Sequence, residues 1–189
     1  MFISICAFSV MDLIVKWSED YPVGQVLFFR GLCGVIPILF LIPNDRYFDF
    51  YKTKRPILHF KRCFAGLIAI VAIFIALRKL PLATVVSVTF AAPIFTTILS
   101  IFILKEKVGL YRWMAVIVGF VGIIIISEPG YSSLNIYYIY PIIFCLGLSY
   151  VAITIRQLST TEPVWLISFY FSLSITLLSF VTIPQGWIM

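Results

Sequence analysis

Long apolar segments alternate with short polar ones along this chain. The apolar segments are residues 2–18, 24–42, 62–79, 82–104, 111–127, 137–157 and 164–183. Each segment is apolar on every side and close to the ~20 residues that a helix needs to cross the hydrocarbon core of a bilayer. Strands of a membrane barrel would instead alternate between apolar and polar residues over about ten positions. The pattern predicts an all-α integral membrane protein with about seven transmembrane helices.

The composition excludes several other classes of protein. Of the 189 residues, 62% are hydrophobic and 12% are charged, whereas a soluble domain carries about 25% charged residues. Disordered and nucleic-acid-binding proteins are excluded for the same reason. Four cysteines without a CxxC pair and a single histidine provide no usual zinc site. We expect the lipid bilayer as a partner, and no nucleic acid, metal or cofactor.

The basic residues predict the orientation. Ten lysines and arginines lie in or beside the loops after the second, fourth and sixth segments, against three at the opposite ends. Basic loops stay in the cytoplasm, so we expect a multi-pass protein of the cell membrane with a cytoplasmic amino terminus. Residues 48–60 mix aromatic residues with lysines and are expected to lie along the inner leaflet, bound in part by anionic lipid.

Two charged residues lie inside predicted spans. Asp12 is the only carboxylate well within a span, and Arg30 lies about as far from the next hairpin turn on the following segment. A charge inside hydrocarbon is costly, so each position requires a reason. One interpretation is a structural ion pair. The other is a contact with substrate, or a carboxylate at Asp12 that binds a proton.

Residues 82–104 carry polar residues at helical spacing, among them Thr89, Pro93 and Thr96. Pro93 removes one backbone hydrogen bond and so kinks or breaks the helix. One interpretation is a binding helix that faces a central cavity, because broken helices mark transporter sites. The alternative is a tolerated proline with threonine hydroxyls bonded to their own helix. Tyr150, in the sixth segment, is a further candidate for the polar lining.

Small residues predict packing seams between helices. They recur on the third segment as alanines and on the fifth as Ala115, Gly119 and Gly122.

A faint internal repeat relates the first two segments to the last two. Phe28-Phe29, for example, matches Phe169-Tyr170, and matched segments are offset by five positions in the order of segments. Five is an odd number, so the second copy is inverted in the membrane. Inverted repeats are typical of secondary transporters, with the substrate site near the midplane between the copies.

Residues 77–126 carry a resemblance to a known family. The features are Leu80-Pro81, Pro93 inside the helix predicted over residues 82–104, Glu106 just after that helix, Trp113, and the pair Gly119 and Gly122. The pattern resembles the EamA-type members of the drug/metabolite transporter superfamily, and Arg30 within Phe28–Gly31 is similar to the family pattern as well.

The resemblance implies a transporter with ten helices in two inverted five-helix repeats. Residues 1–127 would form the first repeat and 137–189 the first two helices of the second. Because the predicted spans end after the seventh, we expect a truncated or partial sequence. By position, the resemblance places Asp12, Thr89, Pro93 and Tyr150 at the cavity. It gives Glu106 a structural role, which is to organise the basic inner loop.

The sequence thus predicts a secondary transporter of small metabolites or drug-like compounds, with protons or a counter-substrate as the candidate coupling partner. Two alternatives stay open. One is a polytopic membrane enzyme, such as an acyl or prenyl transferase, although His59 is the sole imidazole and is expected in a loop without a nearby carboxylate cluster. The other is a channel or a non-transporting membrane subunit.

Overall fold

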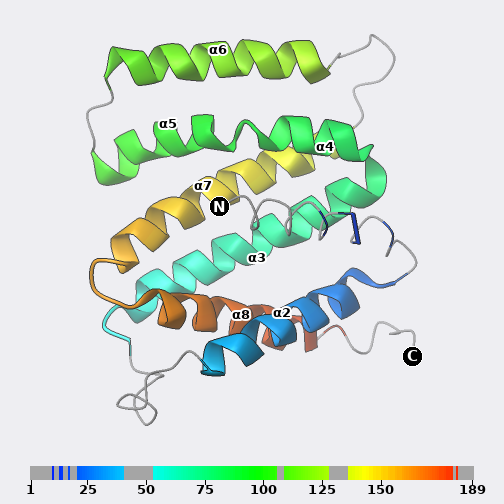
Figure 1. Cartoon of the computed structure of the whole chain (residues 1–189), viewed down its shortest axis with the longest axis vertical. Coiled ribbons are helices and arrows are strands. Elements are labelled where there is room, and N and C mark those ends of the chain that lie inside the picture. Colours follow the sequence, from blue (N-terminus) through cyan, green and yellow to red (C-terminus); the bar gives the residue numbers. More distant parts are fainter. Residues whose placement is uncertain are drawn as a thin grey trace. The chain divides into compact units, whose positions relative to one another are not determined.

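The helices of the computed structural model follow the apolar segments of the sequence (Figure 1). The structure describes residues 10, 13, 14, 17, 21–40, 53–105, 109–127, 136–180 and 182. The predicted helix over 2–18 therefore lies largely outside the described residues, as do Asp12 and Glu106. The described elements are α2 (Val23–Phe40), α3 (Pro56–Lys79), α4 (Leu82–Thr89), α5 (Ala92–Leu104), α6 (Leu110–Ser127), the 3₁₀ turn η2 (Ile136–Tyr138), α7 (Ile139–Leu158) and α8 (Val164–Phe180).

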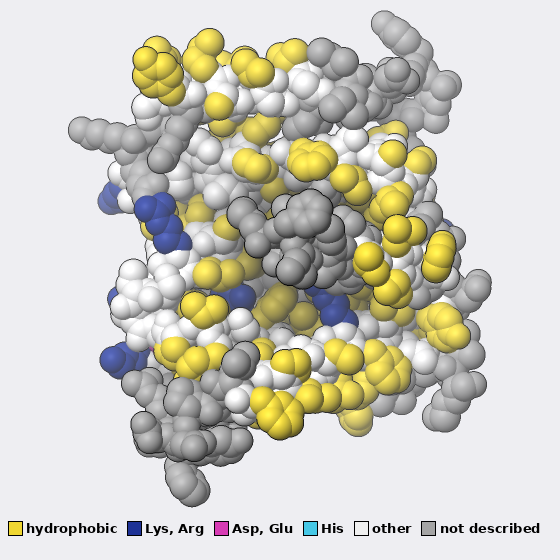
Figure 2. All heavy atoms as spheres, in the orientation of Figure 1, with side chains coloured by type: hydrophobic (Ala, Val, Ile, Leu, Met, Phe, Trp, Pro, Cys, Tyr) yellow, Lys and Arg dark blue, Asp and Glu magenta, His cyan; other side chains and the backbone are white. Residues whose placement is uncertain are grey.

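These helices are those of an integral membrane protein. Within the described residues, four stretches are long and apolar enough to cross a bilayer, and they are Val23–Phe40, Pro56–Lys79, Leu82–Leu104 and Ile136–Leu158. Two shorter apolar stretches, Trp113–Gly122 and Val164–Phe180, accompany them. Figure 2 shows hydrophobic side chains over much of the visible face, with few lysines and arginines among them. The all-helical membrane class is thus confirmed, and the total of seven spans stays a prediction.

The predicted start of the third helix was wrong. The third helix begins at Pro56 and not at residue 62, because proline suits the first turn of a helix and tolerates the charged residues that follow it. His59 therefore lies in the first turns of α3 and not in a loop. The fourth segment forms two helices, α4 and α5, with Phe90 and Ala91 between them, as the position of Pro93 predicts.

The chain divides into two compact units, residues 1–67 with 154–189, and residues 68–153. In the first unit, α2 packs along α8 in antiparallel orientation. A Cβ atom added at Gly31 would lie 2.9 Å from the backbone nitrogen of Thr176, and one at Gly34 would lie 2.7 Å from the Ser172 hydroxyl. These glycines let the two backbones approach closely, which in a membrane replaces the hydrophobic effect as a source of helix association.

The second unit contains α4, α5, α6 and the first part of α7. Its core cluster joins the α4–α5 connection to α7 and consists of Ala91, Ala92, Ile94 and Cys145. On α3, Ala69, Ala72 and Ala76 are buried, as the packing interpretation expects.

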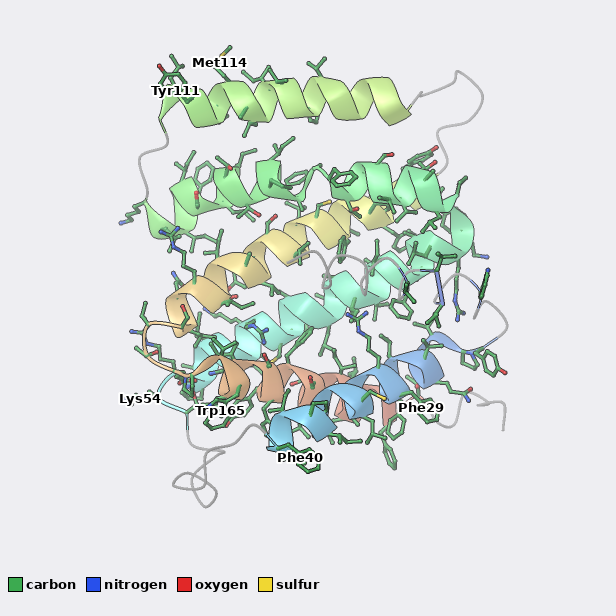
Figure 3. The ribbon with its side chains drawn as sticks, in the orientation of Figure 1. Phe29, Phe40, Lys54, Tyr111, Met114 and Trp165 are labelled. Atoms are coloured by element: carbon green, nitrogen blue, oxygen red, sulfur yellow. The ribbon has the colours of Figure 1, made fainter. Side chains whose placement is uncertain are left out.

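The outer face of α6 has no such partner among the described residues. A Cβ atom added at Gly119 or Gly122 would meet no atom within 4 Å, so the predicted glycine seam is not found within this unit. Tyr111 and Met114 are 93% and 54% exposed and point away from α5 (Figure 3). This face is suited to lipid or to another helix.

Candidate functional site at a broken helix

The break between α4 and α5 follows from one missing backbone donor. In a continuous helix the carbonyl of Thr89 would accept a bond from the N–H of residue 93, and Pro93 has none. The chain passes the break in right-handed conformation, with shorter-range bonds from Ala91 N–H to the Val88 carbonyl and from Ile94 N–H to the Ala91 carbonyl, both 2.9 Å. The break therefore leaves the Thr89 carbonyl without its usual helical donor.

Side chains of α7 bond to the carbonyls at this break. The Cys145 thiol lies 3.4 Å from the Val88 carbonyl oxygen and 3.9 Å from that of Thr89. One turn further along α7, the Ser149 hydroxyl donates to the Ala92 carbonyl at 2.9 Å. Cys145 and Ser149 are fully buried. A polar backbone group inside a membrane protein must be satisfied by neighbours, and here a second helix supplies the donors.

Thr96 joins this network from α5. Its hydroxyl lies 2.8 Å from the Ala92 carbonyl oxygen and 3.0 Å from the Ser149 hydroxyl. The neighbouring Thr97 bonds only to its own helix in the contacts described, at 2.9 Å to the Pro93 carbonyl. Thr96 is thus the predicted site residue that the structure brings into contact with another helix.

The other predicted site residues have different settings. The Thr89 hydroxyl donates to the Val86 carbonyl at 2.7 Å, which matches the alternative in which threonine bonds to its own helix. Pro93 is exposed, and Tyr150 is half-buried beside Ser149. Arg30 is half-buried on α2, in the first unit.

Sequence reasoning missed the role of Cys145, because it considered the cysteines as possible zinc ligands and not as hydrogen-bond donors. The available signal was its spacing from Ser149, since residues four apart share one helix face. Together the two residues form a polar stripe on the face of α7 that meets the break.

A second polar cluster lies in the first unit, at the start of α3. The carboxylate of Glu162, in the loop between α7 and α8, accepts bonds from the backbone N–H groups of Lys54 (2.8 Å) and Arg55 (3.2 Å) and from the Thr53 hydroxyl. Its other oxygen contacts Nε2 of His59. Among the described residues, His59 thus contacts a single carboxylate, that of Glu162. The signal was available in Glu162-Pro163, an acid placed directly before a helix start.

The electrostatics of Glu162 follow from these contacts. Burial opposes the charged form of the carboxyl group and by itself would raise the pKa of Glu162. The opposing effects are larger and lower the pKa. They are the hydrogen bonds from Thr53, His59 and the Lys54 N–H, and the charge attraction of His59. The positive end of the α3 dipole acts in the same direction. Glu162 is thus a carboxylate at neutral pH.

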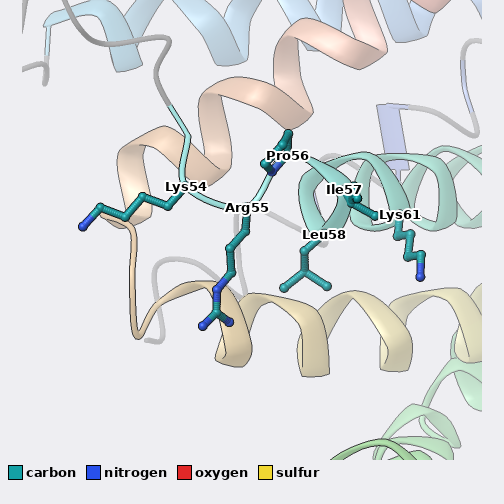
Figure 4. Close-up of a pocket in the computed structure, with 6 residues that line it drawn as sticks. All are labelled: Lys54, Arg55, Pro56, Ile57, Leu58 and Lys61. Carbon is teal, nitrogen blue, oxygen red and sulfur yellow. The ribbon is translucent and has the colours of Figure 1, made fainter.

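Basic residues surround the same end of α3. Lys54, Arg55 and Lys61 line a pocket of about 340 Å³ with Pro56, Ile57 and Leu58 (Figure 4). All three cations are exposed. The contacts of Glu162 with residues 53–55 also place the loops before α3 and before α8 at the same end of the unit, as the orientation prediction requires. At residues 56–60 the backbone is helical and continuous with the rest of α3, and the location of residues 48–60 along the inner leaflet stays a prediction.

Within the described residues, no group of three or more His, Cys, Asp or Glu side chains is placed to hold a metal ion.

Comparison with known proteins gives consistent results. The sequence model of the EamA-like transporter family matches residues 1–128. The chain is 28% identical over 188 residues to an S-adenosylmethionine uptake transporter of Rickettsia prowazekii, covering 98% of this chain and 63% of that protein. It is 28% identical over 182 residues to a pseudopaline exporter of Pseudomonas aeruginosa, covering 95% and 62%. An uncharacterized transporter of Helicobacter pylori is 30% identical over 189 residues, covering 94% and 62%. The chain therefore spans under two thirds of the length of these relatives.

Proposed function

Because the chain belongs to the EamA-like transporter family, we propose that its protein is a secondary transporter that moves small metabolites or drug-like compounds across the cell membrane by alternating access. The observation that carries the proposal is the broken helix α4–α5, whose carbonyls bond to buried side chains of α7. The family and the matched relatives are transporters, so the chain is not a membrane enzyme.

The break is suited to a moving part of a transporter. Hydrogen bonds from Cys145 and Ser149 to backbone carbonyls are individually modest, about 0.6 kcal/mol on average between membrane helices. Such bonds can exchange for bonds to a bound ligand or to water in a cavity without a large cost. A helix with one fewer backbone bond also bends more easily than a continuous one. Alternating access requires an element with two arrangements of similar energy.

The packing of α2 against α8 supports the inverted repeat. These are the helices that the sequence repeat matches, and contacts such as Gly31 with Thr176 show that they run antiparallel. Two copies of one unit, inserted in opposite directions, produce such a pairing. The proposal therefore keeps the division into a first repeat over 1–127 and a partial second repeat over 137–189.

The proposed substrate site contains Thr96, with Thr89, Pro93 and Tyr150 as further candidates in the same unit. Asp12 and Arg30 stay candidates from the sequence alone. Only Thr96 has a described contact that favours it, since its hydroxyl reaches α7. One relative is named for uptake and another for export, so the proposal leaves the direction of transport open. Protons or a counter-substrate are the proposed coupling partners.

Counterflow in proteoliposomes tests the proposal with the full-length protein. The probe is labelled S-adenosylmethionine, added outside vesicles that are loaded with the unlabelled compound. A carrier that alternates its access shows saturable uptake that the internal compound accelerates. Uptake that rises linearly with concentration, without acceleration from inside, would indicate a channel and contradict the proposal.

Two neighbouring threonines provide a matched comparison. Thr96→Val removes the hydroxyl that reaches Ser149, while Thr97→Val removes one that bonds to its own helix. Loss of one hydrogen bond of about 1 kcal/mol corresponds to a rate change of roughly fivefold. We expect that loss for Thr96→Val and less than about a twofold change for Thr97→Val, since the latter bond is local. Equal effects of the two variants on transport would show that the α4–α5 break is not part of the substrate site.

A further inference from the structure

We propose that the start of α3 is a binding site for an anionic phospholipid, whose phosphate lies among Lys54, Arg55 and Lys61 and whose acyl chain follows the exposed apolar side of the helix. The three cations line the pocket of about 340 Å³ described above. The site depends on the chain being a membrane protein and not on the compound that the protein transports.

Charge makes this pocket suited to a phosphate group. Lys54, Arg55 and Lys61 are all exposed, and Arg55 and Lys61 extend to the same side of α3 in Figure 4. The arginine fork can donate two parallel hydrogen bonds to a phosphate, while a lysine adds a compact positive charge. The described residues that line the pocket include no acid. The pocket therefore favours an anion over a zwitterionic headgroup, whose ammonium group these cations would repel.

The nearby carboxylate of Glu162 does not neutralise the pocket. Its oxygens accept bonds from the backbone N–H groups of Lys54 and Arg55 and contact the His59 ring, and its side chain is only 2% exposed. The bonds to residues 54 and 55 involve their backbone, so the charged ends of both side chains stay exposed. With three cations against one carboxylate, this end of the described unit keeps an excess of positive charge.

An exposed apolar row continues from the pocket along the same helix. It consists of Ile57, Phe60 and Phe64, which are 71%, 72% and 58% exposed, and the rings of Phe60 and Phe64 stack with their centroids 6.3 Å apart. Lys61 lies four residues after Ile57 and three before Phe64, so it shares their side of the helix. A cationic pocket from which an apolar row runs into the span matches the two parts of a phospholipid.

The opposite side of the start of α3 is already packed within the fold. His59, Arg62 and Cys63 are buried. The Arg62 guanidinium donates to the Ile167 carbonyl at 3.0 Å and lies 4.9 Å from the centre of the Phe171 ring. These contacts fix this side of α3 against α8, and the apolar row lies on the exposed side.

The pocket also lies at the depth expected for lipid headgroups. It is formed at the first residues of α3, which is long and apolar enough to cross a bilayer. Trp165, in the first turn of α8, belongs to the same end, because Glu162 bonds to the start of α3 from the loop before α8. Tryptophan is enriched at the membrane interface, and basic residues beside a span attract anionic lipid.

Lipid retention by the full-length protein tests the proposal. The protein is purified in micelles that contain equal amounts of phosphatidylglycerol and phosphatidylcholine, and native mass spectrometry measures how much of each lipid stays bound. One lysine or arginine near an anionic surface corresponds to roughly a fivefold gain in binding. We therefore expect the wild type to retain at least about five times more phosphatidylglycerol than phosphatidylcholine. Equal retention of the two lipids would overturn the proposal.

Substitutions show whether such a preference comes from this pocket. Arg55→Gln combined with Lys61→Gln removes two exposed cations, and glutamine at position 55 keeps the backbone N–H that bonds to Glu162. We expect this double variant to lose roughly fivefold or more of the preference. Lys79→Gln removes an exposed cation from the other end of α3 and should behave as the wild type. An unchanged preference in the double variant, or an equal loss in Lys79→Gln, would refute the site.

Two further measurements separate a lipid from a soluble anion, since both carry phosphate. Inorganic phosphate at millimolar concentration should not displace phosphatidylglycerol from the wild type, and displacement would indicate a site for soluble anions and overturn the lipid assignment. Phe60→Ala combined with Phe64→Ala changes two exposed side chains and should lower the retention of phosphatidylglycerol by roughly fivefold or more, because apolar contact with the acyl chain is lost. Unchanged retention in this variant would contradict the path of the chain along the apolar row.

Discussion

Replacing Pro93 by alanine is the sharpest perturbation of the break between α4 and α5. Alanine provides an N–H group at position 93, and the acceptor opposite it is the Thr89 carbonyl, which Cys145 approaches only to 3.9 Å. The new bond would join α4 and α5 into one continuous helix. The side chain of Pro93 is exposed, so the substitution leaves no cavity in the core. We expect a more stable protein that transports more slowly.

The size of the effect can be bounded. A hydrogen bond between groups in a membrane contributes about 0.6 kcal/mol on average and about 1.7 kcal/mol at most. Proline in the interior of a helix costs about 3 kcal/mol relative to alanine. Pro93 already lies in the first turn of α5, where proline is tolerated, so the full cost does not apply. We expect a gain of about 1–2 kcal/mol in the free energy of unfolding.

The assay measures unfolding of the full-length protein in mixed micelles, together with uptake into proteoliposomes. Pro37→Ala is the matched control, because Pro37 is also exposed but lies inside the continuous helix α2. It should stabilise the protein without slowing transport. If Pro93→Ala lowered stability by more than about 1 kcal/mol, a typical destabilisation for a point substitution, the break would be a required part of the packing. If it left transport unchanged, the break would have no role in the transport cycle.

Further predictions concern packing, pH and coupling. Gly31→Ala should destabilise the protein by about 1–3 kcal/mol, because the new Cβ would lie 2.9 Å from the Thr176 backbone nitrogen. Gly119→Ala, whose Cβ would meet no neighbour, should be neutral or stabilising by up to about 1 kcal/mol. Unfolding measurements compare the two variants, and equal losses of stability would contradict the described packing. The pKa of Glu162 is lowered in the folded protein, so its carboxylate stabilises the fold at pH values above the carboxyl pKa of the unfolded chain. This stabilisation is lost as the pH falls through the pKa of Glu162 in the folded protein. Wild type should therefore lose stability in acid more steeply than Glu162→Gln, and parallel pH profiles would disprove this. If Asp12 binds the coupling proton, a pH gradient should drive uptake by the wild type and not by Asp12→Asn, and unchanged gradient dependence would remove that role.

Much of the fold was predictable because hydrocarbon imposes a simple rule on the sequence. An apolar run of about 20 residues must be a helix when no water is available for its backbone, and α2, α6 and α7 follow the predicted segments closely. The break near Pro93 was predictable for a similar reason, since a proline removes a donor at a known position. Helix starts were harder. Charges at Lys61 and Arg62 suggested a boundary, but Pro56 and the cap from Glu162 set the actual start of α3.

The site was predictable only in part, because it depends on contacts between distant segments. Thr96 was identified from its spacing to Pro93, and its contact with Ser149 agrees with that interpretation. Cys145 lies at the same break, and its spacing from Ser149 places it on the same helix face, but the spacing alone does not identify the carbonyls of α4 as its partners. Glu162 and His59 lie 103 residues apart, and nothing in the local pattern of either residue identifies the other.

The central claim is that the region around the α4–α5 break opens to each side of the membrane in turn. Thr96→Cys, in the full-length protein with its native cysteines replaced by serine, is exposed to a membrane-impermeant thiol reagent from either side of sealed vesicles. The account predicts labelling from both sides and slower labelling when substrate saturates the protein. Labelling from one side alone, or none from either side with or without substrate, would contradict it.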